Sequence, residues 1–475
     1  MSESKFELPA ERLATTASDG SRIYLHPAEV TGFFRTLRNR IYEILLVIFV
    51  ALPWVHIQGE QLLLLDVKHQ RFNIFGLKFW GHDAPILFFV LLLFVVGIGL
   101  ITALLGRSWC GWACPQTVFV DRIYRRIEEW IEGKSFERRK LAQAPWTTQK
   151  FLKKSLKWFI FFAISLIFTH SFLAYFVGSN ALIGMVTRSP LEHPTAFLVI
   201  FFTTLIILFD FGWFREQFCI IACPYGRFQS VLMDEHSLTV SYDEKRGEPR
   251  KDQKHMTDHG DCVNCYRCVQ VCPTGIDIRR GTQMECIACT ACIDACDEVM
   301  EKVHKPKGLI RYDRESNLKG QQVKHIRTRV IIYALVFLIG FSALSFILTT
   351  REMLKINFVR PPENPYQLLV PSQEVLNHFK VNLRNQNWDE VSLTFKVSEK
   401  MKALGISLTT PISPLLVPAG SSVRADLFIR FPLNQLEEFP DGLPLEIQLQ
   451  SKRKNLEILN RKVPLIGPLS SGSRS

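Results

Sequence analysis

The sequence predicts a polytopic α-helical membrane protein that carries a cysteine-rich soluble domain and ends in a small β-sandwich. The 475-residue chain combines 47% hydrophobic with 21% charged residues, a mixture that indicates apolar spans alternating with polar loops. All 12 cysteines lie between Cys110 and Cys296, and such bunching is typical of metal or redox chemistry rather than of a disulfide scaffold. Beyond Thr350, short stretches alternate apolar and polar residues, which predicts β-strands.

The first 35 residues are mixed and polar, without a short apolar core that leads to a small-residue cleavage site. They therefore lack the pattern of a secretory signal. We expect residues 1–35 to form a cytoplasmic segment, and the first hydrophobic stretch to stay in the mature protein.

Five stretches pass the length test for a membrane-spanning helix, which needs roughly 20 predominantly apolar residues. The second and fifth are the clearest, whereas the first has a short apolar centre with mixed flanks. A helix buried in a soluble core is the alternative for any one of them. Five stretches with Trp and Arg at their ends favour a membrane protein: Ile41–Val55, Ile86–Leu105, Trp158–Val177, Ala196–Phe214 and Val330–Thr349.

Lysine and arginine are concentrated in alternate connections, and positively charged loops stay on the cytoplasmic side. Residues 106–157 and 215–329 are rich in both, whereas Arg188 is the only one in 178–195. This distribution predicts that the N-terminus and every cysteine face the cytoplasm of a bacterial inner membrane, with the C-terminal segment in the periplasm. Because topology largely accounts for the formal charge of +12, no nucleic-acid partner is predicted.

Two C-x3-C-P motifs follow the second and fourth stretches, and we call their cysteines the two thiol pairs. In "SWCGWACPQ" the pair is Cys110 and Cys114, and in "QFCIIACPYG" it is Cys219 and Cys223. The two halves indicate an internal repeat. Residues four apart share one face of a helix, although the proline disfavours helical geometry in the residue before it.

The thiol pairs have four possible roles. They could bind a soft metal, since thiolates select copper(I), zinc or iron–sulfur. They could instead cycle between dithiol and disulfide, border a quinol site, or simply be small buried packing residues. Two ionisable residues within the spans are further candidates. His170 could ligate copper, bond a quinone or bond a neighbouring helix, and Asp210 could serve a site or pair near the interface.

Eight cysteines form two runs of C-x2-C-x2-C-x3-C, the spacing that ligates [4Fe–4S] cubes. Structural zinc sites usually use two cysteine pairs separated by a spacer instead. The fourth cysteine of each run ligates the other cube. We therefore assign Cys262, Cys265, Cys268 and Cys296 to one cluster, and Cys286, Cys289, Cys292 and Cys272 to the second.

Two such cubes form an electron relay, which needs a donor and an acceptor. The chain has no Rossmann glycine motif for NAD or flavin. We therefore expect electrons to come from a separate protein or from quinol, and the identity of this donor stays open.

The order of the motifs resembles one known family over nearly the whole chain. "CGWACP", "CIIACPYGRFQ", the two ferredoxin runs, "ECIACTACIDACDEVMEKVHKPKGLIRY", a last span and a β-rich tail resemble the CcoG family of cytochrome c oxidase accessory proteins, also called FixG or RdxA. NapH-type membrane ferredoxins share the cysteine motifs but would lack the fifth span and the tail.

The resemblance implies a membrane-bound polyferredoxin that assists assembly of cbb3-type cytochrome c oxidase, by reducing copper(II) to copper(I). Cys110, Cys114, Cys219 and Cys223 become the copper-binding thiols, with His170 as a further candidate ligand. The implied partners are oxidase maturation factors and copper chaperones. The number of copies in the assembly stays open, with a homodimer as one option.

Two other functions stay open, namely a quinol-coupled NapH-like protein without a copper role and a redox-sensing scaffold. The predicted domains are a cytoplasmic segment (1–35), a four-helix membrane core with both C-x3-C-P motifs (36–235), a cytoplasmic two-cluster ferredoxin-like domain (236–327), a fifth transmembrane helix (328–350) and a periplasmic immunoglobulin-like β-sandwich (351–475).

Overall fold

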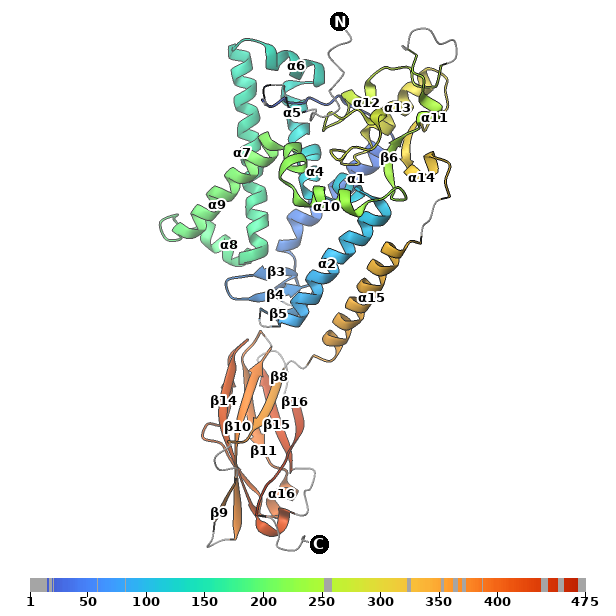
Figure 1. Cartoon of the computed structure of the whole chain (residues 1–475). Coiled ribbons are helices and arrows are strands. Elements are labelled where there is room, and N and C mark those ends of the chain that lie inside the picture. The colour runs from blue at the N-terminus through green and yellow to red at the C-terminus, as the bar shows by residue number, and fades with distance from the viewer. Residues whose placement is uncertain are drawn as a thin grey trace. The chain divides into compact units, whose positions relative to one another are not determined.

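The computed structural model describes residues 15–16, 19, 21–57, 59–81, 83–251, 259–322, 326–351, 354–361, 366–369, 373–386, 388–436, 443–451 and 457–468. They form two compact units (Figure 1). The first contains the described residues up to 69, 73–76 and 84–345, and so holds the apolar helices together with every cysteine. The second contains residues 70–72, 77–83 and the described residues from 346 onward.

Four helices among the described residues are long and apolar enough to cross a membrane. They correspond to the second to fifth predicted stretches. They are α2 (Ala84–Leu105), α7 (Thr148–Val177), α9 (Pro194–Ile207) with its π-helical continuation η4 (Leu208–Phe214), and α15 (Thr328–Thr349). Gly106, at φ 57°, ends α2 with the left-handed residue that commonly closes a helix.

The first predicted stretch differs from expectation. It lies in α1 (Phe33–Ala51), which ends four residues before the predicted limit and is followed by the short 3-10 helix η2 (Leu52–Trp54). Three arginines and one glutamate occupy the first part of α1. These charges make α1 less apolar than the other long helices. By length and composition, four helices of the described residues are therefore candidate spans, rather than the five predicted.

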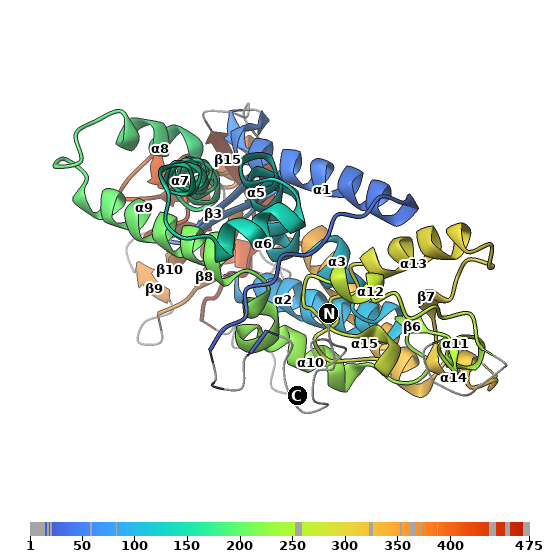
Figure 2. The ribbon, with the colours of Figure 1, turned by 90° about the horizontal axis from the view of Figure 1, so that it is seen from above.

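The spans of the first unit pack in pairs through small residues, which let helix backbones approach closely. Helices α2 and α15 run side by side (Figure 1), and a methyl group added at Gly340 would lie 3.3 Å from the side chain of Leu93. Helix α9 lies along α7, which Figure 2 shows nearly end-on, and Thr204 Oγ1 donates to Thr169 Oγ1 at 3.0 Å.

The remaining elements of the first unit are short. Between α1 and α2 lie β1 (His56–Ile57), β2 (Glu60–Gln61), β3 (Leu63–Asp66) and β4 (Arg71–Ile74), whose first two residues belong to the second unit. After α2 come α3 (Ser108–Trp112), α4 (Pro115–Phe119), the π-helix η3 (Val120–Tyr124), α5 (Arg125–Glu132) and α6 (Ser135–Gln143). Helix α8 (Ser179–Val186) follows α7, and the π-helix η5 (Phe218–Ala222) and α10 (Pro224–Leu232) follow η4.

The two cysteine runs lie within a small α/β fold of the first unit. Its two-stranded antiparallel ribbon joins β6 (Thr239–Tyr242) to β7 (Ile310–Asp313). Its helices are α11 (Glu244–Gly247), α12 (Arg267–Gln270), η6 (Ile278–Arg280), α13 (Ala291–Lys302) and α14 (Glu315–Leu318).

The predicted C-terminal sandwich is confirmed in the second unit. One sheet has the order β12-β14-β10-β8 with β9 also on β10, and the other has the order β13-β11-β15-β16. The strands are β8 (Leu354–Val359), β9 (Tyr366–Leu369), β10 (Glu374–Asn385), β11 (Val391–Lys396), β12 (Ser407–Thr409), β13 (Leu415–Val417), β14 (Ser422–Pro432), β15 (Leu443–Ser451) and β16 (Glu457–Val463), with the short helices α16 (Glu399–Ala403) and η7 (Leu433–Leu436). Alternate residues of β10 are buried, as a half-buried strand requires.

Residues 77–83, in the connection before α2, belong to the sandwich unit. They include β5 (Leu77–Trp80). The indole Nε1 of Trp80 donates to the carbonyl of Gln386 at 3.1 Å, and Asp83 accepts from Arg351 at 2.6 Å. These contacts tie the loop to the sandwich itself.

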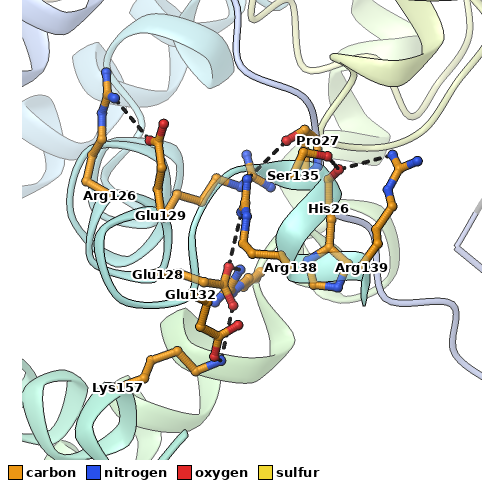
Figure 3. A network of polar contacts seen from close by, with 12 residues as sticks. His26, Pro27, Arg126, Glu128, Glu129, Glu132, Ser135, Arg138, Arg139 and Lys157 are labelled. Atoms are coloured by element: carbon orange, nitrogen blue, oxygen red, sulfur yellow. Dashed lines mark hydrogen bonds and ion pairs between the residues drawn. The ribbon is translucent and has the colours of Figure 1, made fainter. Parts of the chain in front are cut away.

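A buried carboxylate joins helices α5 and α6 to the spans of the first unit. The side chain of Glu128 on α5 is 1% exposed and pairs with Arg215 at 2.9 Å, Lys157 at 3.1 Å and Arg138 at 3.5 Å. Figure 3 shows Arg138 and Lys157 reaching this acidic centre from α6 and α7. Burial alone would raise the pKa of Glu128, but the ion pairs with Arg215 and Lys157 outweigh it and lower this pKa.

We expect the substitution Glu128→Gln to destabilise the first unit by about 3 kcal/mol or more, because breaking one side of a buried ion pair leaves charges without compensation. The measurement is thermal unfolding of the purified protein in detergent. The matched control is Glu129→Gln, whose pair with Arg126 at 3.1 Å lies nearer the surface and should be worth about 0–1 kcal/mol. Equal midpoints for the two variants would contradict the role of Glu128.

The lowered pKa of Glu128 also fixes the sign of its pH dependence. Its stabilising contribution is complete above the ordinary glutamate pKa of 4.5 and is lost as the pH falls toward the lowered folded value. The difference in unfolding free energy between wild type and Glu128→Gln should therefore stay constant near neutral pH and shrink on acidification. A difference that grew on acidification would contradict the assignment.

Candidate electron-transfer site

The two cysteine runs take the same backbone course. In each run the second and fourth residues after the first cysteine are non-glycine residues with positive φ, a conformation that L-residues adopt rarely. These are Asn264 at 52° and Tyr266 at 57° in the first run, and Ala288 at 52° and Thr290 at 63° in the second. A helix, α12 or α13, begins directly after each turn. The repeated turn wraps three cysteines of each run around one volume.

Two cavities lie inside these turns. The first, of about 360 Å³, is lined by Cys262, Cys265, Cys268 and Cys296. The second, of about 350 Å³, is lined by Cys272, Cys286, Cys289 and Cys292, and also touches Cys268. The structure thus brings together the same two groups of four that the spacing assigned, including the exchanged fourth cysteines. The rest of the lining is largely apolar, which suits sulfur ligands around an iron–sulfur cube.

No three His, Cys, Asp or Glu side chains of the described residues converge closely enough to hold a single metal ion. Burial raises the pKa of the Cys268 and Cys286 thiols to about 12 each. Metal ligation must therefore drive their deprotonation, and binding of the clusters releases protons. When bound, the clusters would supply one-electron transfer.

The first C-x3-C-P motif packs directly on the loop of the second cysteine run. A methyl group added at Gly111 would lie 2.4 Å from the carbonyl oxygen of Ala288, so only glycine fits there. Arg107 donates to the carbonyls of Met284 and, at 3.2 Å, Cys286. Trp112 donates to the hydroxyl of Tyr312 at 2.8 Å, and this hydroxyl donates to the Ala288 carbonyl at 3.2 Å. The motif is therefore fixed against the second cavity by backbone and side-chain contacts.

The two thiol pairs come together at this contact. Cys110 from α3 and Cys219 from η5 both pack on the buried group that includes Ile287, Cys289 and Ala291. Burial raises the pKa of Cys110 to about 12, and the neighbouring Cys114 and Cys223 add to the effect. The four thiols interact electrostatically with one another and are thus near neighbours.

Polar side chains support the thiols. Cys110 Sγ donates to Gln229 Oε1 at 3.2 Å, and Gln229 is fully buried. Gln116, two residues after Cys114, donates from Nε2 to Asp210 at 3.0 Å and to the carbonyl of Arg215 at 3.1 Å. Asp210 is therefore tied to the first motif. Three π-helices, η3, η4 and η5, flank these residues, and π-bulges are frequent at functional sites.

The structure does not bring His170 to the thiols. Its Nδ1 lies 2.7 Å from the carbonyl of Leu166, one turn earlier in α7. The adjacent Thr169 pairs with Thr204 of α9, and Thr204 lies ten residues before the end of η4 at Phe214. At 1.5 Å per residue this offset is roughly 15 Å along the helix. His170 lies within the span, and the expectation of a copper ligand finds no support in its surroundings.

Comparison with known proteins identifies three matched regions. Residues 87–135 match a "4Fe-4S binding domain", residues 214–315 a "4Fe-4S dicluster domain", and residues 344–468 an "IG-like fold at C-terminal of FixG". Protein RdxA of Cereibacter sphaeroides is 36% identical over 78% of this chain and 81% of its own length. The chain belongs to the FixG/RdxA/CcoG family.

Two further relatives define how far the family relationship extends. Nitrogen fixation protein FixG of Rhizobium meliloti is 33% identical, and the match covers 89% of each chain. Ferredoxin-type protein NapH of Haemophilus influenzae is 26% identical over 43% of this chain and 65% of its own. The FixG/RdxA/CcoG relationship therefore extends over most of the chain, as the order of the sequence motifs predicted. The protein is a membrane-bound iron–sulfur electron-transfer protein with NapH-like relatives.

Sequence reasoning did not single out Arg107, Gly111, Gln116 or Gln229. Gly111 and Gln116 flank the cysteines in the quoted motifs, so their position was a usable signal. The partners of Arg107 and Gln229 lie more than one hundred residues away in the chain, and no local pattern reveals such contacts.

We expect Gly111→Ala to displace the second cysteine run, because the added methyl group has no space beside Ala288. The purified variant should lose iron and acid-labile sulfide from the second site while keeping the first. Gly99→Ala is the matched control, since nothing lies within 4 Å of the methyl group there. A Gly111→Ala protein with the full iron content of wild type would contradict the contact.

Proposed function

We propose that this protein reduces copper(II) to copper(I) at the two thiol pairs, and so supplies copper in the form that cbb3-type oxidase assembly needs. The observation that carries the proposal is the packing of Cys110 and Cys219 on the group that contains Cys289. Thiolates are soft ligands that select copper(I), as they also select zinc and iron–sulfur clusters. A copper ion held there would lie beside the second cavity, where an electron is delivered. The proposed activity is thus that of a cupric reductase.

The chain's own residues prepare the thiols for this task. Burial keeps Cys110 protonated near neutral pH, so copper must displace protons on binding. Gln229 orients the Cys110 sulfur through its hydrogen bond at 3.2 Å. Oxidase maturation factors and copper chaperones are the proposed acceptors of the product.

We further propose that α1 crosses the membrane as a fifth span, with the clusters cytoplasmic and the sandwich periplasmic in a bacterial inner membrane. Asp294 of α13 accepts from the backbone N–H of Phe34 and Arg35 at the first turn of α1. At the other end, Tyr175 near the end of α7 donates to the carbonyl of Phe49. The charged part of α1 thus lies at the ferredoxin side, where Arg35 and Arg38 pair with Asp121.

Exposed aromatic side chains support the same placement. Trp130, Phe136 and Trp146 are at least 75% exposed and lie on the connection between α2 and α7, among lysines and arginines. Aromatic and basic residues gather at membrane interfaces. The connection between α2 and α7 begins beside the second cysteine run, because it contains Gly111.

A quinol-coupled role without copper is the second candidate, and one observation favours it. Asp210 is tied by Gln116 to the first thiol motif, and an acid at the end of a span could receive a proton from a quinol. This function would leave the thiols as packing residues beside the second cavity.

The deciding experiment adds copper(II) to anaerobically purified, pre-reduced protein and reads copper(I) with a specific chelator dye. Wild type is compared with a variant in which Cys110, Cys114, Cys219 and Cys223 are all serine. We expect copper(I) from wild type and at least a tenfold slower formation from the variant, while cluster absorbance is retained. Equal rates would refute the thiol site, and cluster reduction by a quinol analogue would then support the second candidate.

A further inference from the structure

Arg107 is a buried cation without an acid partner. It is 7% exposed and lies between the end of α2 and the start of α3. Its guanidinium donates to the backbone carbonyls of Met284, Gly226 and, at 3.2 Å, Cys286. No carboxylate among the described residues pairs with it. Because a buried charge is costly unless an opposite charge compensates it, the position implies an anion that the carboxylates of the chain do not supply.

The place of Arg107 in the fold indicates that this anion is the second cluster. Cys286, whose carbonyl Arg107 contacts, lines the second cavity. Burial raises the pKa of the Cys286 thiol to about 12, and the positive charge of Arg107 opposes this effect. An iron–sulfur cube bound by four thiolates is net negative, and reduction makes it more so. The cluster and Arg107 would therefore compensate each other.

Two other buried arginines near the cavities already have acid partners. Arg279 lines the first cavity and pairs with Asp277 at 2.7 Å. Arg38 donates to a carbonyl of the second cysteine run and pairs with Asp121 at 2.9 Å. A paired carboxylate largely cancels the field of a guanidinium at a distance. Of these three arginines, Arg107 is thus the one whose positive charge acts in full on the nearest cluster.

Solvation and charge act in opposite directions on the reduction potentials of the two clusters. Reduction adds negative charge, so water favours the reduced state and burial disfavours it. Cys265 of the first group is exposed, whereas the four cysteines of the second group are buried or half-buried. Burial alone would therefore place the second cluster at the lower potential. Electrons would then stay away from the thiol pairs.

We propose that Arg107 is the counter-charge of the second cluster and raises its reduction potential above that of the first. Electrons would then collect on the cluster beside the thiol pairs. Cys268 lines both cavities, so the two clusters are neighbours. One electron moves from the reduced first cluster to the oxidised second cluster, and no bond forms or breaks. The order of the potentials concerns the clusters alone, and only onward transfer to copper rests on the function proposed above.

The test is a redox titration of the full-length protein with both clusters, in detergent and without copper. Electron paramagnetic resonance follows the reduced clusters. We expect the first electron to appear in the second cluster. Cys286→Ser identifies this signal, because the substitution must change or remove the signal of the cluster that Cys286 binds. A first electron that appears in the other cluster would overturn the proposal.

The variant Arg107→Gln removes the charge and should shift the distribution of one electron between the clusters about tenfold toward the first. A tenfold shift is about 59 mV for a one-electron step. It is the size expected of one charge roughly 10 Å away at an effective dielectric constant of about 20. Arg107→Lys is the matched control, since it keeps the charge but not the guanidinium hydrogen bonds, and should retain most of the wild-type distribution. Unchanged potentials in Arg107→Gln, or equal shifts in the two variants, would refute the role of the charge.

The first cluster offers a reciprocal test. Asp277→Asn removes the acid partner of Arg279, and so leaves an uncompensated cation at the first cavity. We expect the electron distribution to shift about tenfold toward the first cluster, with the potential of the second unchanged. A first cluster whose potential does not rise would contradict the premise that the partner carboxylate cancels the arginine. Iron content measured before titration shows that each variant holds its clusters.

Failure of this proposal is distinguishable from failure of copper reduction, because the potentials are measured without copper. If Arg107→Gln leaves the potentials unchanged but reduced wild type forms copper(I), only the role of Arg107 is wrong. If the potentials shift as expected but reduced wild type forms no copper(I), the role of Arg107 stands and the copper role falls.

Discussion

The close approach of Gly111 to the loop of the second cysteine run is the contact on which the rest of the first unit depends. A single methyl group would collide with the Ala288 carbonyl oxygen at 2.4 Å, so the short helix α3, which follows the span α2, meets the loop of the second cysteine run backbone to backbone. Arg107 and Trp112, on either side of the glycine, extend this contact to the Cys286 carbonyl and to Tyr312. For this reason the ferredoxin-like fold and the spans form one compact unit.

The same contact explains why the chain repeats its thiol motif. The first pair is brought to the second cavity by Gly111, and the second pair arrives from η5 on the same buried surface. Two carboxylates then fix the surrounding helices. Asp294 accepts a hydrogen bond from the start of α1. Glu128 of α5 forms ion pairs with side chains of α6 and α7. The cysteine runs and the thiol pairs are thus held in one compact unit.

Much of this arrangement follows from local patterns, and the rest does not. The cluster cysteines are predictable because ligand spacing is local, and four spans are predictable because apolar length is local. Whether α1 spans the membrane is not predictable in this way, because the ion-pair partner of its arginines Arg35 and Arg38 is Asp121, more than eighty residues later in the chain. The Glu128 centre likewise arises from residues on separate elements. Residues 77–83 lie between the first two predicted spans, and no local pattern reveals that Trp80 and Asp83 bind residues of the sandwich unit.

The most direct test of electron transfer to the thiols is a single-turnover experiment. Protein with fully reduced clusters is mixed rapidly with excess copper(II), and cluster reoxidation and copper(I) formation are followed together. We expect both signals to share one rate constant, and one copper(I) to form for each electron that the clusters lose. Clusters that stay reduced while copper(II) is bound, or that reoxidise without yielding copper(I), would contradict a relay that ends at the thiol pairs.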